Sequence, residues 1–135
     1  MKLTLMFLML SMTCLGQKPE WGEATEWKLY DIHTNKAFAY NADTLHNFKS
    51  IQLDKDSMNT FLSNVSEILN DDGPVWMGFY VASCKLQDGI LRKIDISVYG
   101  GFFYDEKSKT YFQLAKYFSN DWLNYLRDKG TQLEL

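Results

Sequence analysis

The sequence predicts an α+β fold in which an antiparallel sheet of five to six strands carries two helices on one face. Short segments of alternating apolar and polar residues, separated by turn signals, are typical of half-buried strands. Two other segments repeat apolar residues every three or four positions, as an amphipathic helix does. Each helical segment follows three strand segments, so the predicted order is βββα followed by βββα.

The N-terminus indicates export. Residues 1–16 combine one lysine, an apolar run of ten residues and a small-residue end, which is typical of a signal peptide and too short to span a bilayer. We expect cleavage after Gly16 and a location in the periplasm or on the surface of a bacterium. The alternative is a lipoprotein that is cut before Cys14 and carries a lipid anchor there. Either cleavage leaves Cys84 as the one cysteine of the folded part, which favours a bacterial over a eukaryotic secreted domain.

The chain after the signal is expected to form an irregular leader over residues 17–26 and a single domain over residues 27–135. In the first half of that domain, strands are predicted at residues 27–33, 37–41 and 48–53. The helix that follows has one apolar stripe, formed by Met58, Phe61, Leu62, Val65, Ile68 and Leu69. Gly73 and Pro74 mark its end, because glycine accepts a left-handed turn and proline cannot continue a helix.

The second half repeats this plan. Strands are predicted at residues 75–86, at residues 90–99 with a continuation over residues 102–104, and at residues 110–118, and a helix is predicted at residues 120–129. The sequence Asp88-Gly89 favours a hairpin turn between the first two of these strands. The pair Gly100-Gly101 indicates a bulge or bend, since glycine weakens a strand interior. Gly130 is expected to end the last helix.

Residues that could carry catalysis are few. A nucleophilic enzyme needs a base beside its nucleophile, whereas His33 and His46 fall in polar turns and Cys84 is expected to be a packed thiol. The acidic pairs lack the spacing of a calcium loop, no His/Cys cluster suits zinc, and no phosphate-binding loop is present. We therefore predict no catalytic residue, no cofactor and no metal.

Aromatic residues make up 16% of the chain and suggest a recognition surface. We expect Val81 to face the helices together with Ile94, which turns the neighbouring side chains to the other face of the sheet. The predicted partner-binding residues there are Trp76, Tyr80, Asp95, Tyr99, Tyr111, Gln113 and Tyr117. Tyrosine and tryptophan offer a large contact area at little entropic cost. Two alternatives are that these aromatic residues merely stabilise the sheet, or that Trp21 covers this face.

The charge balance narrows the class of partner. Seventeen acidic and fourteen basic residues give a net charge of −3, and without a basic run the chain is a poor nucleic-acid binder. We predict a non-catalytic binding or inhibitor module, such as an immunity-type protein that occludes a protein partner, with acidity favouring a basic one. The alternatives are a surface lipoprotein with a structural or ligand-capture role and a small hydrolase with an unrecognised site.

Overall fold

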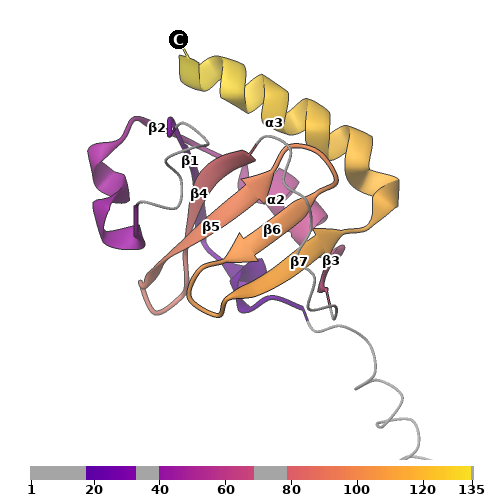
Figure 1. The fold of residues 1–135 in the computed structure, drawn as a ribbon, viewed down its shortest axis with the longest axis horizontal. Helices are drawn as coiled ribbons and strands as arrows, with labels where there is room; N and C mark the ends of the chain where they lie inside the picture. Colours follow the sequence, from indigo (N-terminus) through magenta and orange to yellow (C-terminus); the bar gives the residue numbers. More distant parts are fainter. Residues whose placement is uncertain (1–17, 33–39, 69–78, 135) are drawn as a thin grey trace, which may run out of the picture.

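The computed structural model describes residues 18–32, 40–68 and 79–134, and within them seven strands form one antiparallel sheet of order β2-β1-β4-β5-β6-β7-β3 (Figure 1). The strands are β1 (Glu26–Tyr30), β2 (Ser50–Gln52), β3 (Val65–Glu67), β4 (Phe79–Lys85), β5 (Leu91–Ser97), β6 (Phe102–Asp105) and β7 (Thr110–Leu114). The helices are α2 (Lys55–Leu62) and α3 (Ser119–Glu134), and three short 3-10 helices are η1 (Glu20–Glu23), η3 (Ala42–Asn47) and η4 (Lys116–Phe118). The predicted α+β class and antiparallel sheet are confirmed.

The strand count and the order of elements differ from the prediction. The sheet has seven strands rather than five or six, and α2 ends at Leu62 instead of continuing to Leu69. The chain then forms β3, which pairs with β7 at the edge of the sheet, with Val65 opposite Leu114. Val65, which was counted in the apolar stripe of the predicted helix, is fully buried in this strand instead. The order βββα-βββα is therefore wrong, because β3 lies between α2 and β4.

The expected strand at residues 37–41 falls mostly outside the described residues. Its last two positions, Tyr40 and Asn41, are described and lie outside any strand, directly before η3. The segment 50–52 does pair with β1, with Ile51 opposite Leu29. The first half of the chain thus contributes both edges of the sheet, β2 with β1 on one side and β3 on the other.

Strands β4 to β7 form a meander whose turns follow the glycines. Gly89 adopts φ +85° between β4 and β5, and the Asp88 carboxylate accepts a hydrogen bond from the Ile90 N–H at 3.0 Å. Gly100 and Gly101 adopt φ +80° and +65° between β5 and β6, a conformation that disfavours other residues. The predicted hairpin and the predicted bend are both present.

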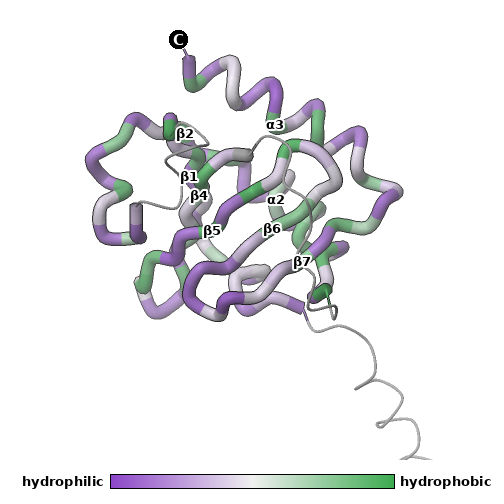
Figure 2. Tube along the Cα trace, viewed as in Figure 1, coloured by the Kyte–Doolittle hydropathy of each residue, from purple (hydrophilic) through white to green (hydrophobic). Residues whose placement is uncertain are grey.

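The main core lies between the sheet and the two helices. Figure 1 shows α2 behind the strands and α3 along the top of the sheet, and Figure 2 shows hydrophobic and hydrophilic stretches alternating along α3. At the centre of this core, the fully buried Trp21 ring lies 5.2–5.6 Å from the ring centroids of Trp27, Phe103 and Phe112. The segment before β1 is therefore part of the core, and the alternative in which Trp21 covers the other face of the sheet is wrong.

Helix α3 continues past its predicted end. It runs through Gly130 to Glu134, with Trp122, Leu126 and Leu133 buried. A Cβ atom at Gly130 would lie 2.1 Å from the Tyr80 hydroxyl oxygen. The glycine therefore serves close packing of the helix on β4 rather than termination of the helix.

Candidate functional site

The sheet face away from the helices, here called the far face, carries one continuous row of paired residues across six strands. Residues directly opposite each other in an antiparallel pair project to the same face. The row consists of Ser50, Tyr30, Val81, Asp95, Tyr104 and Tyr111, each paired with the next. Val81 packs in a second, smaller core with Leu45 of η3, separate from the core under the helices. The far face is therefore partly covered by η3 at its β1 end.

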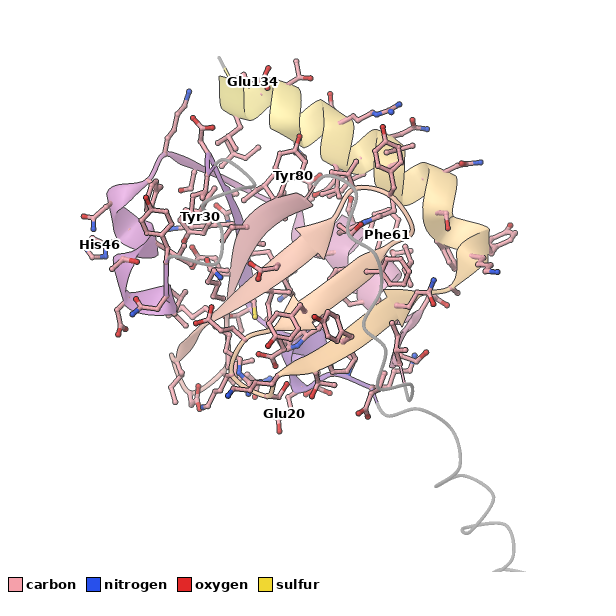
Figure 3. The ribbon with its side chains drawn as sticks, in the orientation of Figure 1. Glu20, Tyr30, His46, Phe61, Tyr80 and Glu134 are labelled. Carbon is pink, nitrogen blue, oxygen red and sulfur yellow. The ribbon has the colours of Figure 1, made fainter. Side chains whose placement is uncertain are left out.

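The predicted orientation of β4 is wrong. Val81 was expected to face the helices beside Ile94, but it pairs with Asp95 on the far face. Ala82 is the residue that pairs with Ile94, and Tyr80 pairs with Ile96 and packs against the main core, where Figure 3 shows it below α3. A shift of one residue in register exchanges the two faces of a strand. The small side chains of β4 lie under the helices, which leaves room for the aromatic rings there.

Three of the seven predicted site residues come together on the far face. Asp95 and Tyr111 belong to the row, and Gln113 lies on the same side of β7, opposite Phe102. Trp76 lies outside the described residues. Of the other three, Tyr80 faces the core as described above.

Tyr99 and Tyr117 lie away from the row. Tyr99 follows the end of β5 and contacts α3, where its hydroxyl oxygen accepts a hydrogen bond from Arg127 Nη2 at 3.1 Å. The Arg127 guanidinium carbon also lies 5.8 Å from the centroid of the Tyr99 ring. Tyr117 belongs to η4, is 88% exposed and contacts the neighbouring Phe118 ring. The structure therefore does not join these two tyrosines to the predicted surface.

Sequence analysis missed the aromatic partner of Tyr111. The Tyr104 and Tyr111 rings lie 4.7 Å apart between centroids, at an interplanar angle of 37°, and both side chains are half-buried. The alternation of β6 identifies this partner, Tyr104. Its neighbour Phe103 is fully buried in the main core, so Tyr104 projects to the far face. The far face thus carries a tyrosine pair at its β6–β7 end.

A charged cluster lies beside this pair. Lys93 Nζ is 3.2 Å from Asp95 Oδ1 and 2.9 Å from Glu106 Oε2. Lys93 and Asp95 are almost fully buried, whereas the Glu106 side chain is 42% exposed. Burial raises the pKa of the Asp95 carboxyl, and the adjacent Lys93 charge opposes that rise. Removing one partner of a buried ion pair is strongly destabilising, so these three side chains are held together. We call Lys93, Asp95 and Glu106 the charged cluster; it lies next to the two tyrosines.

A cleft of about 470 Å³ opens on the far face between η3 and the strands β1 and β4. Figure 3 shows Tyr30 between η3 and the strands and His46 on the outer side of η3. The buried Tyr30 hydroxyl and Ser83 Oγ are hydrogen-bonded at 2.8 Å, and both residues line the cleft. The exposed His46 lies at its rim. The cleft is polar: Asp43, Lys85 and the ion pair of Lys28 with Glu26 at 3.3 Å also line it.

The thiol of Cys84 is packed, as predicted. It lies fully buried in the main core. Burial and the nearby Asp105 carboxylate raise its pKa to about 12, against the opposing charge of Arg92. The thiol is therefore protonated and shielded at physiological pH. His33, the other histidine considered, lies outside the described residues.

Among residues 18–32, 40–68 and 79–134, no group of three or more His, Cys, Asp and Glu side chains is placed to hold a metal ion. Neither helix of that part has the length and apolar character needed to cross a bilayer.

Comparison with known proteins adds no family to this description. No protein-family model matches the chain, and comparison with curated proteins and with solved structures finds no significant similarity.

Proposed function

We propose that this chain is an exported, non-catalytic binding module that engages a protein partner through the β5–β7 end of the far face. The observation that carries the proposal is the half-buried Tyr104–Tyr111 pair, which lies beside the charged cluster. At the other end of the same row, Tyr30 packs with Leu45 of η3 and is 4% exposed, whereas these two rings retain more exposed surface. Aromatic rings framed by polar groups are the common composition of binding hot spots.

The surroundings of the pair favour a protein partner. Gln113 adds an amide on the same face, and the partly exposed Glu106 carboxylate adds negative charge beside the tyrosine pair. A net charge of −3 would attract a basic partner over longer range. An immunity-type inhibitor that occludes a toxin is one protein of this proposed class.

The state of Cys84 disfavours one catalytic alternative, a thiol nucleophile. A nucleophilic thiol needs a low pKa and access to substrate, and Cys84 has a raised pKa and no exposed surface. Export rests on the features of residues 1–16, and a lipid anchor on Cys14 remains part of the alternative role as a surface lipoprotein.

The test is capture of a partner by the mature protein from the envelope of its native host, followed by affinity measurement with matched tyrosine variants. Tyr111→Ala removes one ring of the pair, and Tyr99→Ala removes a ring that contacts α3 instead. We expect Tyr111→Ala to weaken binding about 10-fold or more and Tyr99→Ala to leave it unchanged, with both variants folded by circular dichroism.

Unchanged affinity of a folded Tyr111→Ala variant would refute the proposed face. If no stoichiometric partner is captured and the intact mass shows a diacylglycerol-sized increment at Cys14, the surface lipoprotein becomes the better account. That second outcome would overturn the occlusion proposal itself.

A further inference from the structure

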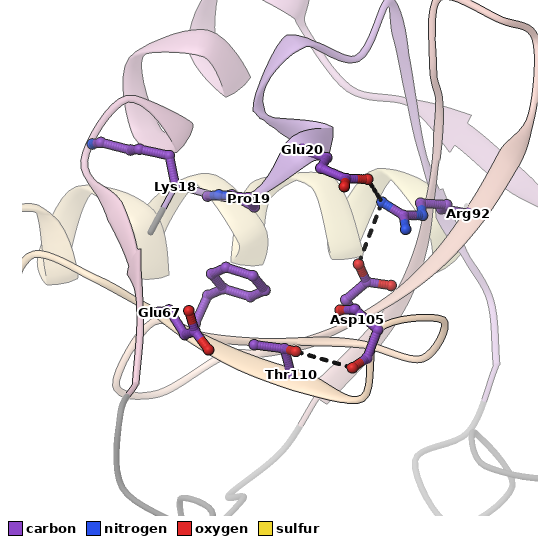
Figure 4. A pocket seen from close by; sticks show the side chains of 9 residues that line it. Lys18, Pro19, Glu20, Glu67, Arg92, Asp105 and Thr110 are labelled. Atoms are coloured by element: carbon purple, nitrogen blue, oxygen red, sulfur yellow. Dashed lines mark hydrogen bonds and ion pairs between the residues drawn. The ribbon is translucent and has the colours of Figure 1, made fainter. Parts of the chain in front are cut away.

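A second cavity lies on the helix side of the sheet, where η1 meets the ends of β5, β6 and β7. Its volume is about 170 Å³ (Figure 4). This is close to the size of a cavity that accepts a benzene-sized molecule, about 150 Å³. The charged residues that line it are Lys18, Glu20, Glu67, Arg92 and Asp105. The hydroxyl groups of Ser108 and Thr110 add further polar lining.

The guanidinium group of Arg92 forms the buried side of this cavity. The Arg92 side chain is 7% exposed, and its Nη1 lies 3.0 Å from Glu20 Oε2 and 3.5 Å from Asp105 Oδ2. Its Nε is buried and has no hydrogen-bond partner in the described part of the chain. A guanidinium offers five N–H donors in a planar fork that suits carboxylates. Arg92 therefore has donor capacity that its present partners do not use.

The two carboxylates that Arg92 contacts differ in kind. Asp105 is a fixed wall: its side chain is 3% exposed, and Oδ1 accepts a hydrogen bond from the Lys107 N–H at 3.0 Å. Glu20 is 79% exposed and extends to Arg92 from η1, as Figure 4 shows. Its carboxylate needs little further hydration to leave for solvent, whereas the buried Arg92 guanidinium then needs another carboxylate in its place.

We infer that this cavity is a carboxylate-binding site whose resting occupant is Glu20. An incoming carboxylate takes the place of the Glu20 carboxylate on Arg92, while the Glu20 charge moves out into solvent, where it is more strongly screened. The Lys18 ammonium donates to the Ser63 carbonyl oxygen outside the cavity and points away from Arg92 (Figure 4), so Arg92 is the cation that would hold the ligand. The ligand class is a small organic acid or the free carboxylate of a peptide.

Glu20 sets the affinity of this site. A group tethered by a short segment acts as a competitor at an effective concentration in the millimolar range. Removing its charge therefore strengthens binding of an external carboxylate. The site lies on the opposite side of the sheet from the far face, so its test is independent of the proposed binding function.

The experiment titrates sodium acetate into the ¹⁵N-labelled mature protein and follows the Nε–H signal of Arg92, with sodium chloride at matched ionic strength as the reference. Glu20→Gln is compared with the wild type and with Glu23→Gln, which neutralises an exposed acid of the same η1 segment. We expect saturable binding in Glu20→Gln with a Kd at least 5-fold lower than in the wild type, and no such gain in Glu23→Gln.

A peptide with a free C-terminal carboxylate and its amidated form then separate the two ligand sources. Tighter binding of the free-acid peptide than of acetate assigns the site to a peptide terminus, and equal binding assigns it to small acids. The inference is overturned if acetate does not saturate the Arg92 signal in Glu20→Gln, or if Glu23→Gln gains as much affinity as Glu20→Gln.

Discussion

Substitution of Gly130 by alanine tests the packing of α3 on the sheet. An added Cβ would lie 2.1 Å from the Tyr80 hydroxyl oxygen and 2.9 Å from its ring carbon Cζ. Overpacking of a filled site costs about 1–3 kcal/mol, whereas alanine gains about 1 kcal/mol over glycine within a helix. Because the oxygen contact is far inside van der Waals distance, we expect the upper part of that cost. Gly130→Ala should therefore lower the free energy of unfolding by about 1–2 kcal/mol.

The same geometry predicts that Tyr80→Phe relieves the effect. Without the hydroxyl oxygen, the nearest atom to the added Cβ is the ring carbon at 2.9 Å. That smaller overlap is offset by the gain in helix propensity, so Gly130→Ala should be about neutral in the Tyr80→Phe background. The two substitutions should thus show a coupling of about 1–2 kcal/mol in a double-mutant cycle.

The assay is urea unfolding of the four proteins of the cycle, followed by circular dichroism, with thermal midpoints as a second measure. A loss of 1 kcal/mol corresponds to about 4 °C in a domain of this size. Asn124→Ala, at an exposed position of α3, controls for helix propensity and should be slightly stabilising. If Gly130→Ala stabilises the protein in the presence of Tyr80, or if the coupling is absent, the contact between α3 and β4 is not as described.

Two further predictions concern the main core. Cys84 should not react with a thiol reagent at pH 8 in the native protein, because a pKa of about 12 lowers the thiolate fraction about 1000-fold relative to a free thiol and the side chain is buried; rapid reaction without denaturant would contradict its placement. Phe61→Ala should lower the free energy of unfolding by about 3–5 kcal/mol, since the ring is 7% exposed and lies 5.0 Å from the centroid of Trp122. An unchanged urea midpoint would show that α2 does not pack on α3.

The sequence allowed the fold class to be predicted because its alternation is local. Along β5, the apolar Ile94 and Ile96 face the core, and Asp95 between them faces away, as expected. The strand β3 was missed because Val65 fits both a helical stripe and a strand that faces the same core. Periodicity alone cannot separate these two in a segment of three residues.

The candidate sites were less predictable because they depend on register and on distant contacts. In β4, large side chains occur at both odd and even positions. The apolar pattern therefore did not decide whether Tyr80 or Val81 faces the helices. The pairing of β4 with β5 settles that choice. The contact between Glu20 and Arg92 connects β5 with the segment that precedes β1. The two residues are far apart in the chain, so no local sequence pattern predicts the contact.

The burial of Trp21 determines when this domain can fold during synthesis. Its ring contacts with Phe103 and Phe112 join positions roughly 80–90 residues apart in the chain. A chain that emerges N-terminus first, from the ribosome or into the compartment to which it is exported, therefore cannot close this core before β7 and α3 follow, and until then Trp21 and Trp27 have no completed apolar surface to cover them. Polypeptides truncated before β7 should consequently be aggregation-prone and depend on chaperones, even though they contain most of the strands.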